Sequence, residues 1–288
     1  MSGGISITLM PTRRDNVTVN NFLNDSREKL RRRKRLILFI SILTILSMTT
    51  STFAWFTVNT FAGVQVFELN ISTGDDLRVS MQNHGADIDQ YGHVITNEML
   101  NSYLQSGYNK TLEDVILDPV TTSDGRTFTY QDGTVVQANG DESYFEFECY
   151  FIATRDMHVH LSNADADDNG RQTAETGGTV VSTDSPAPQS DVIRACRIGF
   201  EGEGNAVKTY EPNKGVQSTS LATFDPPGGP TYSDDNNLFT LEKLTPKKVT
   251  VRVWLEGEDP ECDNDIQRAD LKIKLSFVGI RNGSNTPR

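Results

Sequence analysis

Hydrophobic and polar residues alternate along most of the chain beyond residue 60. This period of two is typical of β-strands that bury one face. In the strongest example, we expect the valines of Val249–Leu255 to face a core and Thr250, Arg252 and Trp254 to face outward. The strand-like segments are Phe67–Ile71, Phe145–Phe151, Val249–Leu255 and Leu271–Phe277, and, with weaker patterns, Leu77–Met81, Thr127–Tyr130, Met157–Leu161, Val192–Phe200 and Leu238–Leu241.

Two short segments have a helical pattern instead. In Asn97–Leu104 the apolar residues fall on one helical face, and Leu112–Leu117 is a second candidate. With about nine strands and no long helix, the pattern predicts an all-β fold, an antiparallel β-sandwich.

Two connections between the expected strands are unusually long. They cover residues 163–191 and 225–237 and are rich in Gly, Pro, Ser and Asp. Connections in compact domains are mostly shorter. These segments are therefore either functional surface loops or insertions.

The N-terminal region has a different pattern. Residues 1–35 form a basic leader that ends in the five basic residues Arg31–Arg35, and an apolar run begins at Leu36. Basic residues beside an apolar segment stay in the cytoplasm, so the chain after this run is expected to cross the membrane. We expect the protein to be extracellular or displayed on the cell surface.

Residues 36–54 fit a signal-peptide core, which needs about 7–15 apolar residues followed by small side chains. A cut between Ala54 and Trp55 would place small residues at the −3 and −1 positions, and signal peptidase would then be a partner. Alternatively, an uncleaved tilted helix reaching Phe56 would anchor the protein in the membrane. In both cases residues 55–288 form the exported β domain, and this helix is the only membrane contact we expect.

Charge excludes some partners. The chain has a formal charge of −12, which divides into +6 for residues 1–54 and −18 for the remainder. An acidic exported surface repels phosphate backbones and anionic lipids. We therefore expect no nucleic-acid binding and no docking to a membrane surface.

The sequence has three cysteines, Cys149, Cys196 and Cys262. Export permits disulfides, but an odd number leaves at least one cysteine unpaired. Cys149 shares the apolar phase of its strand, which favours a buried hydrophobic role. Cys196 and Cys262 could pair, although their spacing does not test this.

Most acidic and histidine clusters have a simple structural interpretation. His158 and His160 would lie on one strand face without an obvious third metal ligand. The acidic string after Trp254 is expected to form a hairpin turn between two C-terminal strands, with a cation site as the alternative. No catalytic motif is recognisable, so we do not expect an enzyme.

Residues 165–170 resemble the first half of a calcium-binding loop. The second half does not fit, because the twelfth position is Thr176 and the nearest carboxylate comes one residue early. No cofactor is therefore expected, with calcium as the alternative. Its candidate ligands would be Asp165, Asp167, Asn169 and Glu175.

The segment that follows the cleavage site is apolar and β-prone and has no upstream partner strand. It could fold back as the first strand of its own domain, or add to a sheet edge of a second copy. Repeated from copy to copy, the second outcome builds a filament, because a contact that does not close continues to grow. The residues expected in this donor strand are Trp55, Phe56, Val58, Phe61, Val64, Val66, Phe67, Leu69 and Ile71.

The segments Ser51–Thr57 and Val66–Ile71, followed by an acidic β-rich region, resemble the TasA/camelysin group of bacterial surface proteins. The resemblance covers mainly residues 36–80. It implies a signal peptide removed by a SipW-type peptidase, a jelly-roll fold, and fibres built by donation of the N-terminal strand. Some camelysin-like proteins are labelled metallopeptidases, but this chain has no zinc-peptidase helix that could carry the label.

Two functional hypotheses follow. The first is a structural subunit of an extracellular filament or matrix, such as a biofilm matrix, that self-associates through its N-terminal strand. The second is a single-pass anchored ectodomain that binds a ligand such as carbohydrate through its two long loops. The state of the N-terminal segment distinguishes them, because only the first requires cleavage before Trp55.

Overall fold

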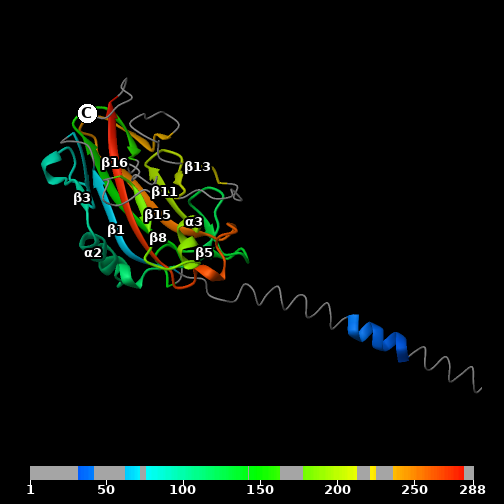
Figure 1. Cartoon of the computed structure of the whole chain (residues 1–288). Helices are drawn as coiled ribbons and strands as arrows, with labels where there is room; N and C mark the ends of the chain where they lie inside the picture. The colour runs from blue at the N-terminus through cyan, green and yellow to red at the C-terminus, as the bar shows by residue number, and fades with distance from the viewer. Residues whose placement is uncertain are drawn as a thin grey trace, which may run out of the picture. The chain divides into compact units, whose positions relative to one another are not determined.

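The computed structural model describes residues 32–41, 62–71, 76–141, 143–162, 178–212, 221–224 and 236–281. The chain divides into two units, Met1–Val58 and Asn59–Arg288. In the first unit, residues 32–41 form a helix whose side chains are exposed (Figure 1). None of the helices in the described ranges combines the length and apolar character needed to cross a membrane.

The described residues of the second unit form two large β-sheets and one small one. Sheet A has the strand order β14 (Phe239–Leu241), β9 (Met157–Leu161), β16 (Asp270–Arg281), β1 (Ala62–Ile71) and β3 (Val94–Ile95), with β10 (Val180–Ser182) also on β16 and β4 (Ile116–Leu117) also on β1. Sheet B has the order β13 (Thr223–Phe224), β12 (Lys208–Tyr210), β11 (Cys196–Gly202), β15 (Lys247–Glu256), β8 (Phe145–Ala153) and β2 (Leu77–Ser80), with β5 (Pro119–Val120) on β15. The small sheet pairs β6 (Phe128–Thr129) with β7 (Val135–Val136).

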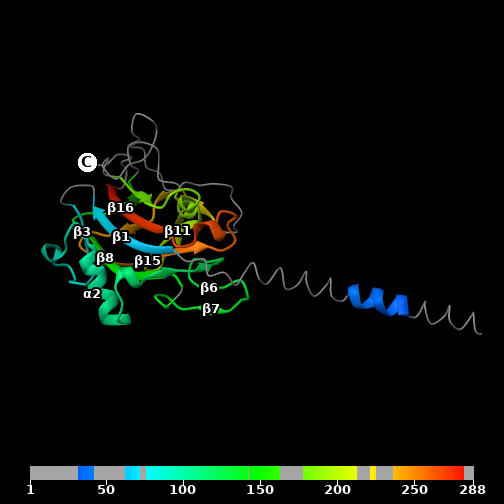
Figure 2. The ribbon, with the colours of Figure 1, turned by 60° about the horizontal axis from the view of Figure 1, so that its bottom comes forward.

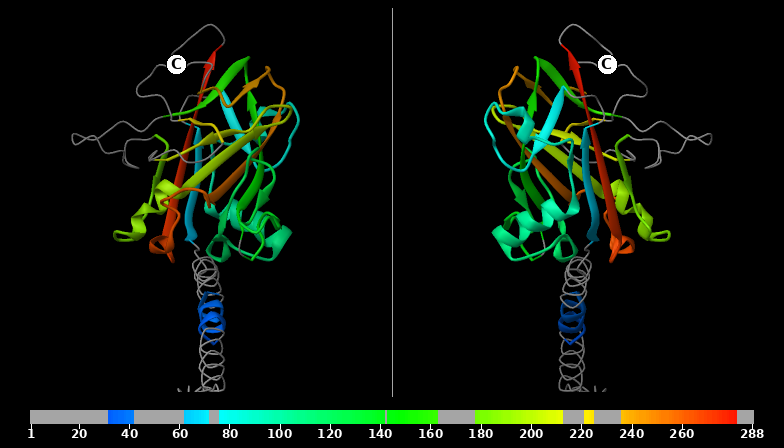
Figure 3. Two further views of the ribbon diagram at one scale, coloured as in Figure 1. Left: turned by 90° about the vertical axis from the view of Figure 1, so that its right-hand side faces the viewer. Right: turned by 90° about the vertical axis from the view of Figure 1, so that its left-hand side faces the viewer.

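The prediction of a mostly β protein is confirmed, but the prediction of purely antiparallel pairing is wrong. Both large sheets are mixed, because β1 pairs with β16, β12 with β13, and β15 with β5 in parallel. The red β16 and the blue-to-cyan β1 run side by side in Figures 1 and 3. Alternation of apolar residues reveals which face of a strand is buried and says nothing about the direction of its partner.

The two large sheets share one hydrophobic core. Phe67 of β1 makes edge contacts with Phe145 and Phe147 of β8, with ring centroids 5.8 and 5.2 Å apart. Phe277 of β16 makes similar contacts with Phe151 and Phe200 from sheet B. These aromatic pairs join the inner faces of the sheets, as expected for alternating strands that bury one face each.

Strand β15 is buried on both faces, which corrects the prediction that Thr250, Arg252 and Trp254 face solvent. Trp254 lies in a second cluster with Phe128 of β6 and Tyr144, and β6 and β7 are drawn next to sheet B in Figure 2. The outer face of β15 is therefore covered by the segment that contains this hairpin. Such cover by a distant segment leaves no signal in the alternation of β15 itself.

Two local predictions also need correction, and a third is confirmed. The expected strand Val192–Phe200 begins as the short helix α3 (Val192–Ala195), and the strand β11 follows it. The expected helix Leu112–Leu117 is a 3₁₀ turn, η2 (Leu112–Asp114), followed by β4. The helix predicted at Asn97–Leu104 is confirmed and extends further, as α2 (Asn97–Tyr108). The part of the chain that the structure describes also has the 3₁₀ turns η1 (Ile88–Gln90), η4 (Gln189–Asp191) and η6 (Asn264–Ile266).

The first long connection is an insertion in a strand. β9 and β10 both pair antiparallel with β16, on consecutive stretches of it. The backbone N–H of Thr179 donates to the carbonyl of Ser162, which joins the two pieces. The predicted loop 163–191 therefore contains a strand and a 3₁₀ turn, and its residues 163–177 lie outside the described residues. In the second loop, residues 225–235 also lie outside them.

Candidate functional site

Part of the predicted donor strand is β1 of this chain. Val64, Val66, Phe67, Leu69 and Ile71 lie in β1, which pairs within its own sheet. The predicted residues Trp55, Phe56, Val58 and Phe61, and the cleavage residue Ala54, lie outside the described residues. Within one copy, the chain adopts the first of the two outcomes considered above, in which the segment folds back.

A β-bulge sets the two faces of β1. The register with β16 shifts between Val64 and Val66, so Gln65 is the additional residue. Before the bulge Ala62 and Val64 are buried, and after it Phe67 and Leu69 are buried. The bulge thus reverses the phase of alternation and leaves Val66 pointing outward, 36 % exposed.

The partner of β1 is the last strand described. Eight residue pairs connect the two strands, from Gly63 opposite Asp270 to Ile71 opposite Phe277. The inward-facing residues of β16 that the alternation predicts, Leu271, Ile273, Leu275 and Phe277, are all buried. Among the described strands, the longest parallel pairing therefore joins segments about two hundred residues apart in the sequence.

The other edge of β1 is held in three places. Antiparallel β4 pairs with its beginning and antiparallel β3 with its end. Between them, the backbone N–H of Phe67 donates to Oδ1 of Asn97, the first residue of α2, at 2.8 Å. The side chain of Asn97 takes the place of a neighbouring strand at Phe67, so this edge of β1 has fewer unpaired backbone groups that another strand could bind.

A cavity of about 290 Å³ lies beside this capped stretch of β1. Its lining includes Val66 and Glu68 of β1 and Thr96 and Glu98 near the start of α2. Glu68 accepts a hydrogen bond from the side chain of Asn70, and a hydrogen bond from Thr96 lowers the pKa of Glu98. The two carboxylates make this cavity unsuitable for an anion.

The far end of the β1–β16 pair is closed by ionic contacts. Asp76, shortly after β1, pairs with Arg281 at the end of β16 at 3.3 Å and with Arg155 at 3.0 Å. The hydroxyl of Thr154 donates to the same carboxylate. The hydrogen bond from Thr154 is the main cause that lowers the pKa of Asp76, and the two arginines add to it against the opposing effect of burial.

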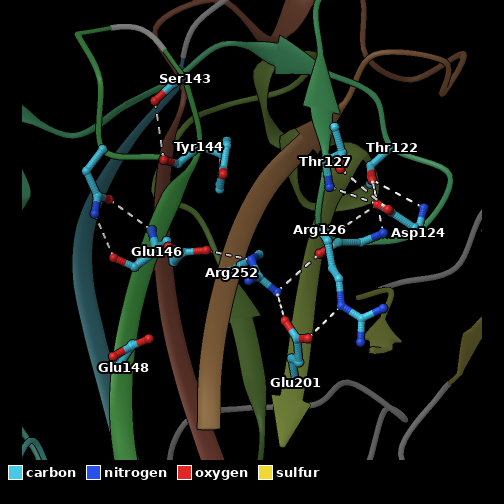
Figure 4. A network of polar contacts seen from close by, with 12 residues as sticks. Thr122, Asp124, Arg126, Thr127, Ser143, Tyr144, Glu146, Glu148, Glu201 and Arg252 are labelled. Atoms are coloured by element: carbon cyan, nitrogen blue, oxygen red, sulfur yellow. Dashed lines mark hydrogen bonds and ion pairs between the residues drawn. The ribbon is translucent and has the colours of Figure 1, made fainter. Parts of the chain in front are cut away.

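A second polar network lies on the outer face of sheet B (Figure 4). Arg252 of β15 donates to Glu146 of β8 at 2.6 Å and to Glu201 of β11 at 2.7 Å, and Arg126 donates to Glu201 at 2.6 Å. Burial opposes ionisation of Glu201, but hydrogen bonds from Arg126 and Arg252 outweigh it and lower the pKa of this carboxyl. The network joins three neighbouring strands and the covering segment, and its geometry is that of a structural cross-link.

The acidic string after Trp254 does not form a hairpin, because β15 belongs to sheet B and β16 to sheet A. The string instead contains a buried ion pair. Asp259 accepts a hydrogen bond from the guanidinium of Arg197, and Glu211 lies 3.2 Å from the same group. All three side chains are almost completely buried, so an arginine takes the place of the cation considered from the sequence.

The described residues contain no group of three or more His, Cys, Asp and Glu side chains arranged to hold a metal ion. The calcium candidates Asp165, Asp167, Asn169 and Glu175 fall outside these residues, so calcium binding there stays a prediction. The histidines of β9 serve as hydrogen-bonding groups. The ring of His158 contacts Asn237 at 2.8 Å, and that of His160 contacts the side chain of Asn236 at 2.9 Å.

All three cysteines are free. Cys149 is buried and its thiol contacts the backbone carbonyl of Val249, in agreement with the hydrophobic role expected for it. Burial raises the pKa of the Cys196 thiol to about 12, which keeps it protonated and unreactive at neutral pH.

Searches with this chain find no match among family models, curated proteins or solved structures. Sequence reasoning located β1 as a strand but missed its bulge, although the adjacent apolar residues Val66 and Phe67 break the alternation and could have indicated it.

Proposed function

We propose that this chain is an exported structural protein of the cell surface, a subunit of an extracellular filament or matrix. In this proposal the folded unit is a jelly-roll-like β-sandwich. After the signal segment is removed before Trp55, copies join when the N-terminal strand of one pairs with a sheet of the next. The acidic exported region and the apolar segment that precedes β1 motivate this assignment.

The observation that carries the proposal is the position of β1. It is a buried strand, it is the first strand described, and residues 72–75 alone separate it from the rest of the folded unit. A strand at a chain end can be supplied by a second copy without threading the chain through a loop. Exchange of identical elements between copies preserves every native contact, so it costs little free energy.

The exchange predicts what the acceptor must offer. When β1 of one copy is donated, the vacant position lies between β16 on one side and β3 and β4 on the other. An incoming β1 regains the eight pairs with β16, the cap from Asn97 and the aromatic contacts of Phe67. Donation continued from copy to copy in an open chain produces a filament instead of a closed dimer.

Electron microscopy of the purified mature protein tests the proposal. Filaments whose length increases with protein concentration are expected. A solution that contains only monodisperse monomers at high concentration would refute it. The matched control is the intact chain that retains its leader, because an unprocessed apolar segment should prevent the strand from leaving its own sheet.

N-terminal sequencing of the native protein separates this function from that of an anchored, ligand-binding ectodomain. A mature N-terminus at Trp55 supports assembly, because cleavage frees the segment that precedes β1. An intact leader on surface-displayed protein would favour the anchored ectodomain.

A further inference from the structure

We propose that the parallel pair β1–β16 is a mechanical clamp, which lets the folded unit carry tension applied between its two ends. This tension acts on a copy that keeps β1 in its own sheet, so the clamp is independent of the strand donation proposed above. The clamp itself is a property of the fold and does not require polymerisation.

The direction of loading follows from the pairing. Tension on the N-terminal side enters β1 at Ala62, and tension on the C-terminal side enters β16 at Arg281. Because the strands are parallel, Ala62 lies at the end of the pair where Asp270 begins β16, and Arg281 lies at the opposite end. The line of force between the two entry points therefore runs along the strands.

Loading along the strands strains all the connecting hydrogen bonds together. Eight residue pairs, from Gly63–Asp270 to Ile71–Phe277, must slide past each other before the strands separate. If the terminal strands were antiparallel, both forces would enter at the same end, and the pairs would break one after another. Forced unfolding is governed by the unfolding barrier, so simultaneous loading raises the force that the domain withstands.

Contacts outside the pair also resist sliding of β1. The other edge of β1 pairs with β3 and β4. Between these two pairings, the side chain of Asn97 accepts a hydrogen bond from the backbone N–H of Phe67. The ring of Phe67 is fully buried between Phe145 and Phe147 of the opposite sheet. Movement of β1 along its axis therefore breaks packing as well as hydrogen bonds.

An ion pair reinforces the β1–β16 pair at Arg281, where tension enters β16. Arg281 pairs with Asp76, which follows β1, so the two strands are also linked at their C-terminal ends. The pKa of Asp76 is lowered, mainly by the hydrogen bond from Thr154, which keeps this carboxylate charged under neutral conditions.

Single-molecule force spectroscopy on the full-length chain in detergent tests the clamp with two pulling geometries. In the first, the chain is held by tags at its two termini. In the second, the N-terminal tag is kept, and the other attachment is an azide-bearing amino acid in place of Asp265, an exposed residue of η6 just before β16. The second geometry loads the pair from the end where Gly63 meets Asp270, so β1 is peeled from β16.

End-to-end pulling should require a several-fold higher unfolding force than pulling against position 265. Two matched variants refine the comparison. Leu69→Ala in β1 and Leu241→Ala in β14 each remove a fully buried leucine from the same core. We expect Leu69→Ala to lower the end-to-end force more than Leu241→Ala, at comparable losses of equilibrium stability.

Equal forces in the two geometries, or a lower force in end-to-end pulling, would overturn the clamp. This outcome is independent of the filament assay. A high end-to-end unfolding force in a protein that stays monomeric would support the clamp and contradict the proposed assembly. Filaments of a protein that unfolds at low force would support the assembly and contradict the clamp.

Discussion

At the scale of single residues, two buried arginines among the described residues are each paired with two carboxylates. Arg252 lies between Glu146 and Glu201 on sheet B, and Arg197 lies beside Asp259 and Glu211. A buried charge is tolerated when opposite charges and hydrogen bonds replace the lost water. Arg197 is shared by Asp259 and Glu211, and Arg252 is shared by Glu146 and Glu201, of which Glu201 also pairs with Arg126.

The Arg252 network predicts a large difference between two ion pairs on the same strands. Arg252→Met should lower the free energy of unfolding by about 3 kcal/mol, since it removes the arginine of the partly buried Glu146 and leaves Glu201 with Arg126 alone. Lys248→Met is the matched control, because Lys248 pairs with Glu148 while both side chains are more than a third exposed. Its loss should stay below about 1 kcal/mol. Urea denaturation of both variants measures the difference, and equal losses would contradict the structural role of the network.

Glu256 predicts how stability depends on pH. Burial raises the pKa of its carboxyl above the usual value of 4.5, although Trp254 and Thr121 donate hydrogen bonds to it. The folded state therefore binds this proton more tightly than the unfolded state, and stability increases as the pH falls through the raised pKa.

Replacement of Glu256 by Gln removes this titration and keeps an acceptor for the indole N–H of Trp254. The wild type should gain stability relative to Glu256→Gln as the pH falls toward the usual carboxyl pKa of 4.5. Thermal denaturation at a series of pH values gives this comparison. Parallel curves for the two proteins would show that Glu256 does not titrate in this range.

At the scale of elements, the sequence predicts that β1 is a strand but does not predict which strand it pairs with. The alternation of Phe67–Ile71 predicted a half-buried strand, because the buried face of a strand is recorded locally in the sequence. Its parallel pairing with β16 was not predictable, because register and direction depend on a segment two hundred residues away. The helix α3 was mistaken for a strand for a related reason, since Val192 and Ile193 favour strands locally.

The bulge in β1 predicts stability losses of very different size for substitutions at two neighbouring residues. Phe67→Ala should lower the free energy of unfolding by about 3–5 kcal/mol, because the ring is fully buried against Phe145 and Phe147. Val66→Ala should cost less than about 1 kcal/mol, because Val66 points outward. Chemical denaturation of both variants checks the phase of the strand. A larger loss for Val66→Ala would place the bulge elsewhere.

At the scale of the whole molecule, the chain contrasts a basic N-terminal leader with a strongly acidic remainder. The acidic charge keeps copies apart in general, so association needs a specific contact that overcomes the repulsion. A donated strand provides such a contact through backbone hydrogen bonds and buried apolar side chains. The sequence predicted which segment contains the candidate site. The tertiary structure was needed to show that β1 lies between β16 on one side and β3 and β4 on the other.

The most direct test of the assembly locks β1 to its own sheet. Glu68 of β1 lies opposite Lys274 of β16, both side chains are partly exposed, and cysteines at opposed positions of neighbouring strands can form a disulfide. We predict that the double variant Glu68→Cys/Lys274→Cys stays monomeric when oxidised and forms filaments when reduced, as seen by electron microscopy. The single variant Glu68→Cys, which lacks the partner cysteine, should form filaments under both conditions. Filaments of the oxidised double variant, with the intramolecular disulfide verified by mass spectrometry, would contradict strand donation.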